Sequence, residues 1–219
     1  MKQEYKLREV FDEKSKTLDE KLIEVFINFL IEKVNKSKCD YLHIDVMDNT
    51  FTNSSSFDIN SFNDISINKK IDVHIMSDNI DKLVDDFSRL NPEFITFHVE
   101  IGSTLEYINK IKNKGIKVGI AVNPNTDIEK VYPYLEMVDL ILIMSVNPGK
   151  GGQKFMPEVI CKMQELKEIQ PDYKFLIEAD GGINDETIKY ISNYVDISVC
   201  GSYITDSKDY DDKIQKLNI

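Results

Sequence analysis

The stretch VDLILIMSVNPGKGGQKF, residues 138–155, begins the unit from which we expect the whole chain to be built. Its first seven residues are almost all apolar, which is typical of a strand buried on both faces. The glycine-rich segment 147–153 follows, and residues 157–169 then have the spacing of an amphipathic helix. A buried strand, a loop and a helix form one βα unit of a parallel sheet.

The same alternation of strand and helix recurs along the chain. We expect eight strands, the first of them weak, at residues 5–11, 41–46, 71–76, 94–98, 117–122, 138–144, 173–179 and 195–200. Helical segments between them include 18–34, 104–114, 157–169 and 186–192. The Asn- and Ser-rich segment 49–70 predicts a long loop with a short helix around residues 57–67.

Eight βα units in 219 residues predict the α/β fold of a single (β/α)8 TIM barrel. One barrel of this kind commonly fills a chain of this length. We therefore expect residues 1–219 to form a single domain.

The charge and the cysteines exclude several classes of protein. Thirty-eight acidic residues against 27 basic ones give a net charge of -11, which disfavours nucleic acid as a partner. The cysteines Cys39, Cys161 and Cys200 form no C-x-x-C pair, so neither a disulfide framework nor a zinc finger is indicated. Because no signal peptide or membrane span is visible, we expect a cytoplasmic protein with no membrane partner.

Polar side chains occupy the ends of three predicted strands, where barrel enzymes place their active sites. His43 and Asp45 are two residues apart on one strand face, His74 occupies the next strand, and Asp180 ends the seventh. Each residue alone is explained as a core histidine or a capping aspartate. Together they form a nitrogen and oxygen set that suits one divalent ion such as Zn, Fe, Mn or Co.

Four further residues lie at strand ends without a settled role. Met47, Met76 and Met144 are expected to line the pocket, although methionines are also common fillers of gaps in a core. His98 ends the fourth strand, and it either lies behind the ligands or faces the substrate.

Glycine-rich loops follow the last three strands. Such loops present backbone N–H groups to anions, so they predict a phosphate site near the ends of these strands. The residues expected to bind phosphate are Gly149, Lys150, Gly151, Gly152, Gly181, Gly182, Gly201 and Ser202. The substrate is therefore expected to be a small phosphorylated molecule.

Seven stretches together resemble the ribulose-phosphate 3-epimerase family: YLHIDVMD (41–48), DVHIM (72–76), FHVE (97–100), KVGIAVNPNT (117–126), MSVNPGKGGQKF (144–155), EADGGIN (178–184) and CGSYI (200–204). The resemblance implies an isomerase of carbohydrate metabolism that converts D-ribulose 5-phosphate to D-xylulose 5-phosphate in the pentose phosphate pathway. It further implies that His43, Asp45, His74 and Asp180 bind the metal. Asp45 and Asp180 would also transfer the protons through an enediolate, and His74 would contact the substrate.

The chain departs from the family pattern at three places. The first predicted strand lacks the usual substrate-contacting serine, although Ser15 is nearby. The loop at residues 48–54 reads DNTFTNS, and Lys150 replaces the usual aromatic residue. Two alternatives therefore stay open: an epimerase of a related sugar phosphate such as allulose 6-phosphate, or a catalytically weakened paralogue that only binds sugar phosphates. A homo-oligomer is compatible with either.

Overall fold

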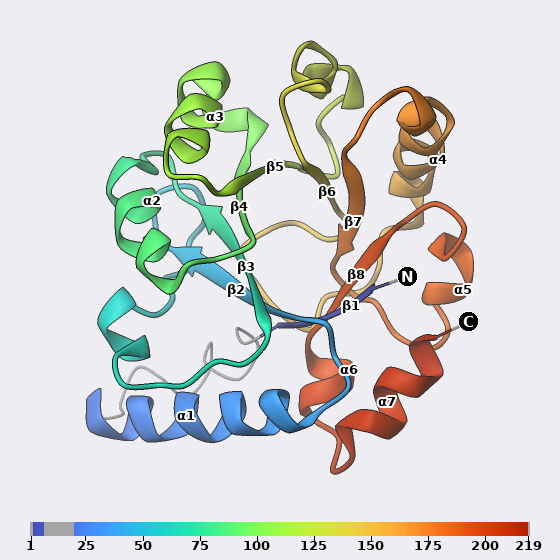
Figure 1. Cartoon of the computed structure of the whole chain (residues 1–219). Coiled ribbons are helices and arrows are strands. Elements are labelled where there is room, and N and C mark those ends of the chain that lie inside the picture. The colour runs from blue at the N-terminus through green and yellow to red at the C-terminus, as the bar shows by residue number, and fades with distance from the viewer. Residues whose placement is uncertain (1, 7–19, 219) are drawn as a thin grey trace.

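The computed structural model describes residues 2–6 and 20–218, with side chains from residue 25 onward. Its eight parallel strands form a closed barrel in the order β1 to β8, and the helices surround it (Figure 1). The strands are β1 (Lys2–Lys6), β2 (Tyr41–Met47), β3 (Lys70–Met76), β4 (Phe94–His98), β5 (Lys117–Val122), β6 (Leu140–Met144), β7 (Leu176–Asp180) and β8 (Ile197–Cys200). The predicted TIM barrel is thus confirmed, and the single domain over the full chain stays a prediction.

The first strand begins earlier in the chain than the sequence predicts. It was expected at residues 5–11, whereas β1 spans Lys2–Lys6 and residues 7–11 lie outside the described part of the chain. Its backbone pairs with β8 on one side and β2 on the other, with Lys2 opposite Ile197 and Glu4 opposite Tyr41. These two ladders place a strand where the sequence is polar, because backbone pairing does not require an apolar side-chain pattern.

The helices follow the predicted alternation. They are α1 (Glu20–Lys36), α2 (Asp81–Phe87), α3 (Thr104–Asn113), α4 (Ile160–Ile169), α5 (Ile188–Ile191), α6 (Ser202–Thr205) and α7 (Tyr210–Leu217). Shorter 3-10 turns are η3 (Ile59–Phe62), η4 (Ser88–Leu90), η5 (Val99–Ile101), η6 (Ile128–Tyr134), η7 (Pro157–Val159) and η8 (Gln170–Asp172). The helix predicted at 186–192 is shortened to α5, and the short helix of the 49–70 loop is η3.

Two hydrophobic clusters support the barrel. The larger one includes Ile44, Val73 and Ile141 and packs the outer strand faces against the surrounding helices. The smaller one includes Tyr41 and Leu140, near the amino ends of their strands. On β2 the inward-facing positions after Tyr41 are polar, namely His43 and Asp45, so this strand carries polar groups toward its carboxyl end. Among the described residues, no helix has the length and apolar character needed to cross a membrane.

Candidate active site

The candidate active site lies inside the barrel, where polar side chains from three strands meet. His43 and Asp45 from β2, His74 from β3 and Asp180 from β7 each offer one ligand atom, all within 4.8 Å of one another. Asp45 and His74 are direct neighbours in the register of β2 and β3. All four side chains are buried. The convergence that the strand positions predicted is therefore present, while the roles of these residues stay predictions.

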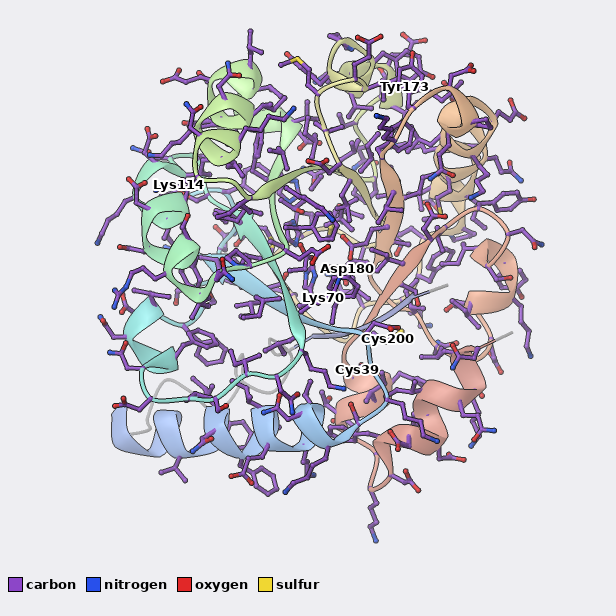
Figure 2. All side chains as sticks on the ribbon, viewed as in Figure 1. Cys39, Lys70, Lys114, Tyr173, Asp180 and Cys200 are labelled. Carbon is purple, nitrogen blue, oxygen red and sulfur yellow. The ribbon has the colours of Figure 1, made fainter. Side chains whose placement is uncertain are left out.

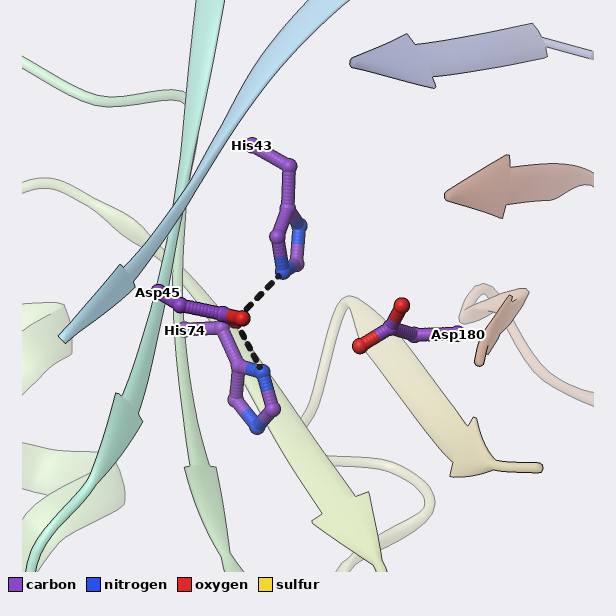
Figure 3. Close-up of side chains that lie close together, drawn as sticks. All are labelled: His43, Asp45, His74 and Asp180. Carbon is purple, nitrogen blue, oxygen red and sulfur yellow. Dashed lines mark hydrogen bonds and ion pairs between the residues drawn. The ribbon is translucent and has the colours of Figure 1, made fainter. Parts of the chain in front are cut away.

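Asp45 stands between two imidazole rings. Its Oδ1 lies 3.2 Å from His43 Nε2 and 3.1 Å from His74 Nδ1 (Figure 3). The carboxylate of Asp180 approaches from the opposite side of this group in Figure 3, and Figure 2 labels it near the middle of the ring of strands. Two carboxylates on opposite walls can reach both faces of a planar group held between them.

The protonation of His74 suits a metal ligand. Complete burial of the ring removes it from water and lowers its pKa to about 4, although the nearby Asp45 carboxylate acts in the opposite direction. The ring is therefore neutral near pH 7, as a metal-bound histidine must be. With His43, Asp45 and Asp180 it offers two nitrogen and two carboxylate ligands, which fit one divalent ion such as Zn, Fe, Mn or Co.

A second layer of acidic side chains lies below these residues and was missed by the sequence analysis. Asp72 Oδ2 lies 2.6 Å from His43 Nδ1, and Glu178 belongs to the same buried group. The sequence contains a pattern from which both residues could be predicted, since Asp72 precedes His74 by two residues and Glu178 precedes Asp180 by two. Alternate strand residues share one face, so these carboxylates point into the barrel one layer deeper.

His98 lies directly behind His74. The Nε2 atoms of the two rings are 2.9 Å apart, and both rings are fully buried. The ring of Phe51 packs on His98 with a centroid distance of 4.5 Å. On its other side His98 Nδ1 lies 3.3 Å from Glu100 Oε2. Of the two positions considered for His98, the structure therefore places it behind a candidate ligand.

Some of the predicted phosphate-binding residues share one pocket. Gly152, Gly182 and Ser202 line a pocket of about 550 Å³ at the ends of β6, β7 and β8, together with Lys154. Gly182 has a φ of +63°, and a Cβ there would lie 2.5 Å from the backbone nitrogen of Phe155. A glycine is therefore required for the two loops to approach each other this closely.

Gly181 and Gly201 shape the ends of their strands. Gly181 has a φ of +122°, and a Cβ there would lie 2.5 Å from the Val146 side chain. The buried hydroxyl of Ser145 donates to the carbonyl oxygens of Asp180, at 2.9 Å, and Gly181, at 2.6 Å. Gly201 directly precedes α6. Ser145 was missed because a lone serine after a strand has no distinctive pattern.

Gly149 and Lys150 line a different, smaller hollow of about 200 Å³, beside Asn53 and Ser54. The hydroxyl of Ser54 donates to the carbonyl oxygen of Gly149 at 2.5 Å, so the loop after β2 contacts the loop after β6. Five of the predicted phosphate residues thus line two hollows: Gly152, Gly182 and Ser202 the larger one, and Gly149 and Lys150 the smaller one. Lys154 lines the larger one.

The three methionines are buried at the ends of their strands. Met47 and Met76 are opposite each other in the register of β2 and β3. Met144 packs in the inner hydrophobic cluster and is opposite Asp180 in the register of β6 and β7. Met144 therefore supports the wall beside Asp180, and a pocket-lining role for the three stays a prediction.

Sequence comparison places the chain in a family. Residues 25–205 match the model of the Ribulose-phosphate 3 epimerase family. A Helicobacter pylori protein named ribulose-phosphate 3-epimerase is 38% identical over 84% of this chain and 88% of its own length. The protein of that name from Buchnera aphidicola is 40% identical over 81% of this chain and 82% of its own length. The chain belongs to the ribulose-phosphate 3-epimerase family.

Solved structures of other proteins share the fold. The 3-hexulose-6-phosphate synthase of Salmonella typhimurium superposes with a TM-score of 0.64 at 17% identity, covering 99% of this chain and 96% of that one. Another 3-hexulose-6-phosphate synthase has a TM-score of 0.67 at 9% identity over 99% and 98% of the two chains. At such low identity these likenesses establish the barrel and nothing about activity.

Proposed function

We propose that this chain interconverts D-ribulose 5-phosphate and D-xylulose 5-phosphate by inverting carbon 3, with a divalent metal as cofactor. The observation that carries the proposal is the convergence of Asp45 and Asp180 from opposite walls onto one buried site with His43 and His74. The family membership and the names of its relatives support the same reaction.

The reaction removes a proton next to a carbonyl group and returns one to the opposite face of the resulting planar enediolate. A carboxylate is a suitable general base for one face, and a carboxylic acid a suitable donor for the other. Asp45 and Asp180 are placed to serve one face each, and they exchange roles when the reaction runs backwards. Burial of the site keeps bulk water from the reacting carbon.

His43, Asp45, His74 and Asp180 would hold the metal. When bound, the divalent ion would supply Lewis-acid stabilisation of the negative charge that develops on the substrate oxygens. Asp72, 2.6 Å from His43 Nδ1, orients that ring from behind. Such contacts keep the ligand atoms directed at one point.

The pocket lined by Gly152, Gly182 and Ser202 would bind the phosphate group. Glycine-rich loops hold anions through backbone N–H groups, which explains how an acidic protein can bind an anionic substrate. The phosphate would then fix the distance from the pocket to the reacting carbon, so this side of the site supplies orientation.

A coupled assay on D-ribulose 5-phosphate tests the proposal. We expect turnover that is lost after chelation and restored by one of Zn, Fe, Mn or Co. Higher activity on allulose 6-phosphate would instead make the chain an epimerase of that sugar. Sugar-phosphate binding without turnover in any metal would identify a weakened paralogue and overturn the proposal.

A further inference from the structure

Two side chains near the proposed metal ligands, one buried and one partly buried, take no part in the proton chemistry described above. His98 is fully buried at the end of β4, and Glu100 follows it in η5. The chain has three histidines in all, and His43, His74 and His98 lie side by side in this cluster. A histidine that contacts a ligand from behind can determine which ring nitrogen of that ligand carries the proton.

Glu100 is held firmly as an anion. Its Oε1 accepts a hydrogen bond from the backbone N–H of Asn123 at 2.8 Å. Burial acts to raise the pKa of the Glu100 carboxyl, but hydrogen bonds from His98, Thr126 and Asn123 outweigh it and lower the pKa to about 2. The carboxylate can therefore only accept hydrogen bonds near pH 7.

We propose that Glu100 and His98 are positioning residues that control the tautomer of His74. The inference rests on the proposed metal site. Glu100 Oε2, 3.3 Å from His98 Nδ1, accepts a hydrogen bond from the N–H group at that nitrogen. With its proton on Nδ1, His98 presents a lone pair on Nε2, which accepts a hydrogen bond from the Nε2–H group of His74 at 2.9 Å. The Nδ1 atom of His74 is left without a proton.

The consequence appears at Asp45. In this tautomer the Nδ1 lone pair of His74 faces Asp45 Oδ1 at 3.1 Å, so two hydrogen-bond acceptors face each other. A cation held by both atoms makes this arrangement favourable. Without the acceptor on His98, the His74 proton could move to Nδ1 and bond with Asp45, which would remove that nitrogen as a ligand.

Phe51 covers part of the chain of hydrogen bonds that runs from Glu100 through His98 to His74, which we call the relay. Its ring lies 4.5 Å from the His98 ring, tilted by 37°. Phe51 is carried by the loop after β2, which is tied back by the Thr50 hydroxyl donating to Asp48 Oδ1 at 2.6 Å. Water therefore has little access to His98, and the bonds to Glu100 and His74 face less competition from solvent.

Because the chain has only three histidines, their tautomers can be read directly by nitrogen NMR. The full chain is labelled with 15N-histidine and loaded with Zn²⁺. We expect a proton on Nε2 of His74, a proton on Nδ1 of His98, and none on the remaining nitrogen of either ring. A proton on Nδ1 of His74, or on Nε2 of His98, would overturn the proposal.

Variants measure what the relay contributes to metal binding, with Zn²⁺ affinity determined by competition with a chelator. His98→Phe keeps a ring but removes the acceptor, so we expect affinity to fall about 10- to 100-fold. His98→Gln restores an acceptor and should recover part of that loss, and Glu100→Gln should have a smaller effect than His98→Phe. Glu93→Gln is the matched control, because Glu93 adjoins the other end of β4 and pairs with Lys70 and Lys117.

The outcomes separate the relay from the proposed function. Zinc binding and turnover in the unaltered chain, with affinity unchanged in His98→Phe, would refute the relay alone. Equal losses in His98→Phe, His98→Gln and Glu93→Gln would also refute it, since a general packing defect would then explain them. Absence of metal binding in the unaltered chain would refute the proposed metal site itself.

Discussion

The two sides of the barrel mouth are built on opposite principles. The side formed by β2, β3 and β4 gathers imidazole and carboxylate groups into one buried network around His43, His74 and His98. The side formed by β6, β7 and β8 has a pocket lined in part by Gly152 and Gly182, two residues that have no side chain beyond a hydrogen atom. Asp180 is the exception, because it ends β7 and faces the network on the opposite wall.

The two sides differ in which kind of substitution impairs their function. We call the side formed by β2, β3 and β4 the network side and the side formed by β6, β7 and β8 the glycine side. On the network side, function depends on the chemical identity of each group, and a substitution that preserves shape can still remove the chemistry. On the glycine side, function depends on the backbone path, and adding one methyl group can displace a loop. Substitutions on the two sides should therefore affect different kinetic parameters.

The largest effect is expected from replacing the carboxylates. Asp45→Asn and Asp180→Asn keep the shape of the side chain but remove the proton carrier, so turnover should fall by about 10²- to 10⁴-fold. Steady-state kinetics with metal supplied in excess measures the loss. A single variant should still exchange the carbon-3 proton of one epimer with D2O without converting it.

Exposed Asp172→Asn is the control for this pair and should leave turnover unchanged. Near-normal epimerisation in both Asp45→Asn and Asp180→Asn, with metal bound, would show that the proton carriers are other residues.

The next effect should come from the glycine side. Gly182→Ala places a Cβ 2.5 Å from the Phe155 backbone nitrogen, so one of the two loops must shift. A displacement of the phosphate pocket by about 1 Å should lower kcat/KM by about 10²-fold, mainly through KM. Kinetics over a wide range of substrate concentrations separates the two parameters.

Gly115→Ala is the matched control, since Gly115 also has a positive φ, +74°, but no atom lies within 4 Å of its added Cβ. It should cost about 1 kcal/mol in the free energy of unfolding and leave KM unchanged. An equal rise in KM in both variants would contradict the role given to Gly182.

The buried His74 on the network side should also make the free energy of unfolding depend on pH. In the metal-free protein the pKa of His74 is lowered from 6.5 to about 4, so the unfolded chain takes up a proton before the folded one does. Its contribution to the free energy of unfolding is complete above pH 6.5 and is lost as the pH falls toward 4. Urea denaturation of chelated protein at several pH values measures this slope.

In His74→Gln that slope should be smaller between pH 6.5 and 4, because the titrating ring is gone. Identical slopes in the variant and the unaltered chain would show that burial of His74 does not control this pH range.

The smallest change in KM is expected when either of two lysines near the phosphate pocket is replaced. Lys154 lines the same pocket as Gly182 and Ser202, whereas Lys150 lines the neighbouring hollow. Both lysines are exposed, so Lys154→Ala should raise KM by at most about fivefold, the size expected of an exposed ion pair. Lys150→Ala should change KM less, and a larger effect from Lys150→Ala would reassign the phosphate contact.

The number and order of the βα units, and the residues at the ends of the strands, can be predicted from the residue pattern alone. Runs dominated by apolar residues predicted β2 to β6 closely, because a strand buried on both faces leaves a strong local signal. The two-residue spacing of His43 and Asp45 predicted that they share a face. These features depend on neighbours in the chain, which is why they can be predicted without a structure.

The remaining features follow from the tertiary structure. It placed β1 at Lys2–Lys6, between two ladders whose other strands are distant in sequence. It set His98 behind His74 and separated Lys150 from the pocket lined by Gly182. Each of these depends on the closure of the barrel, which brings together backbone and side-chain groups whose spacing along the chain contains no information about their distance.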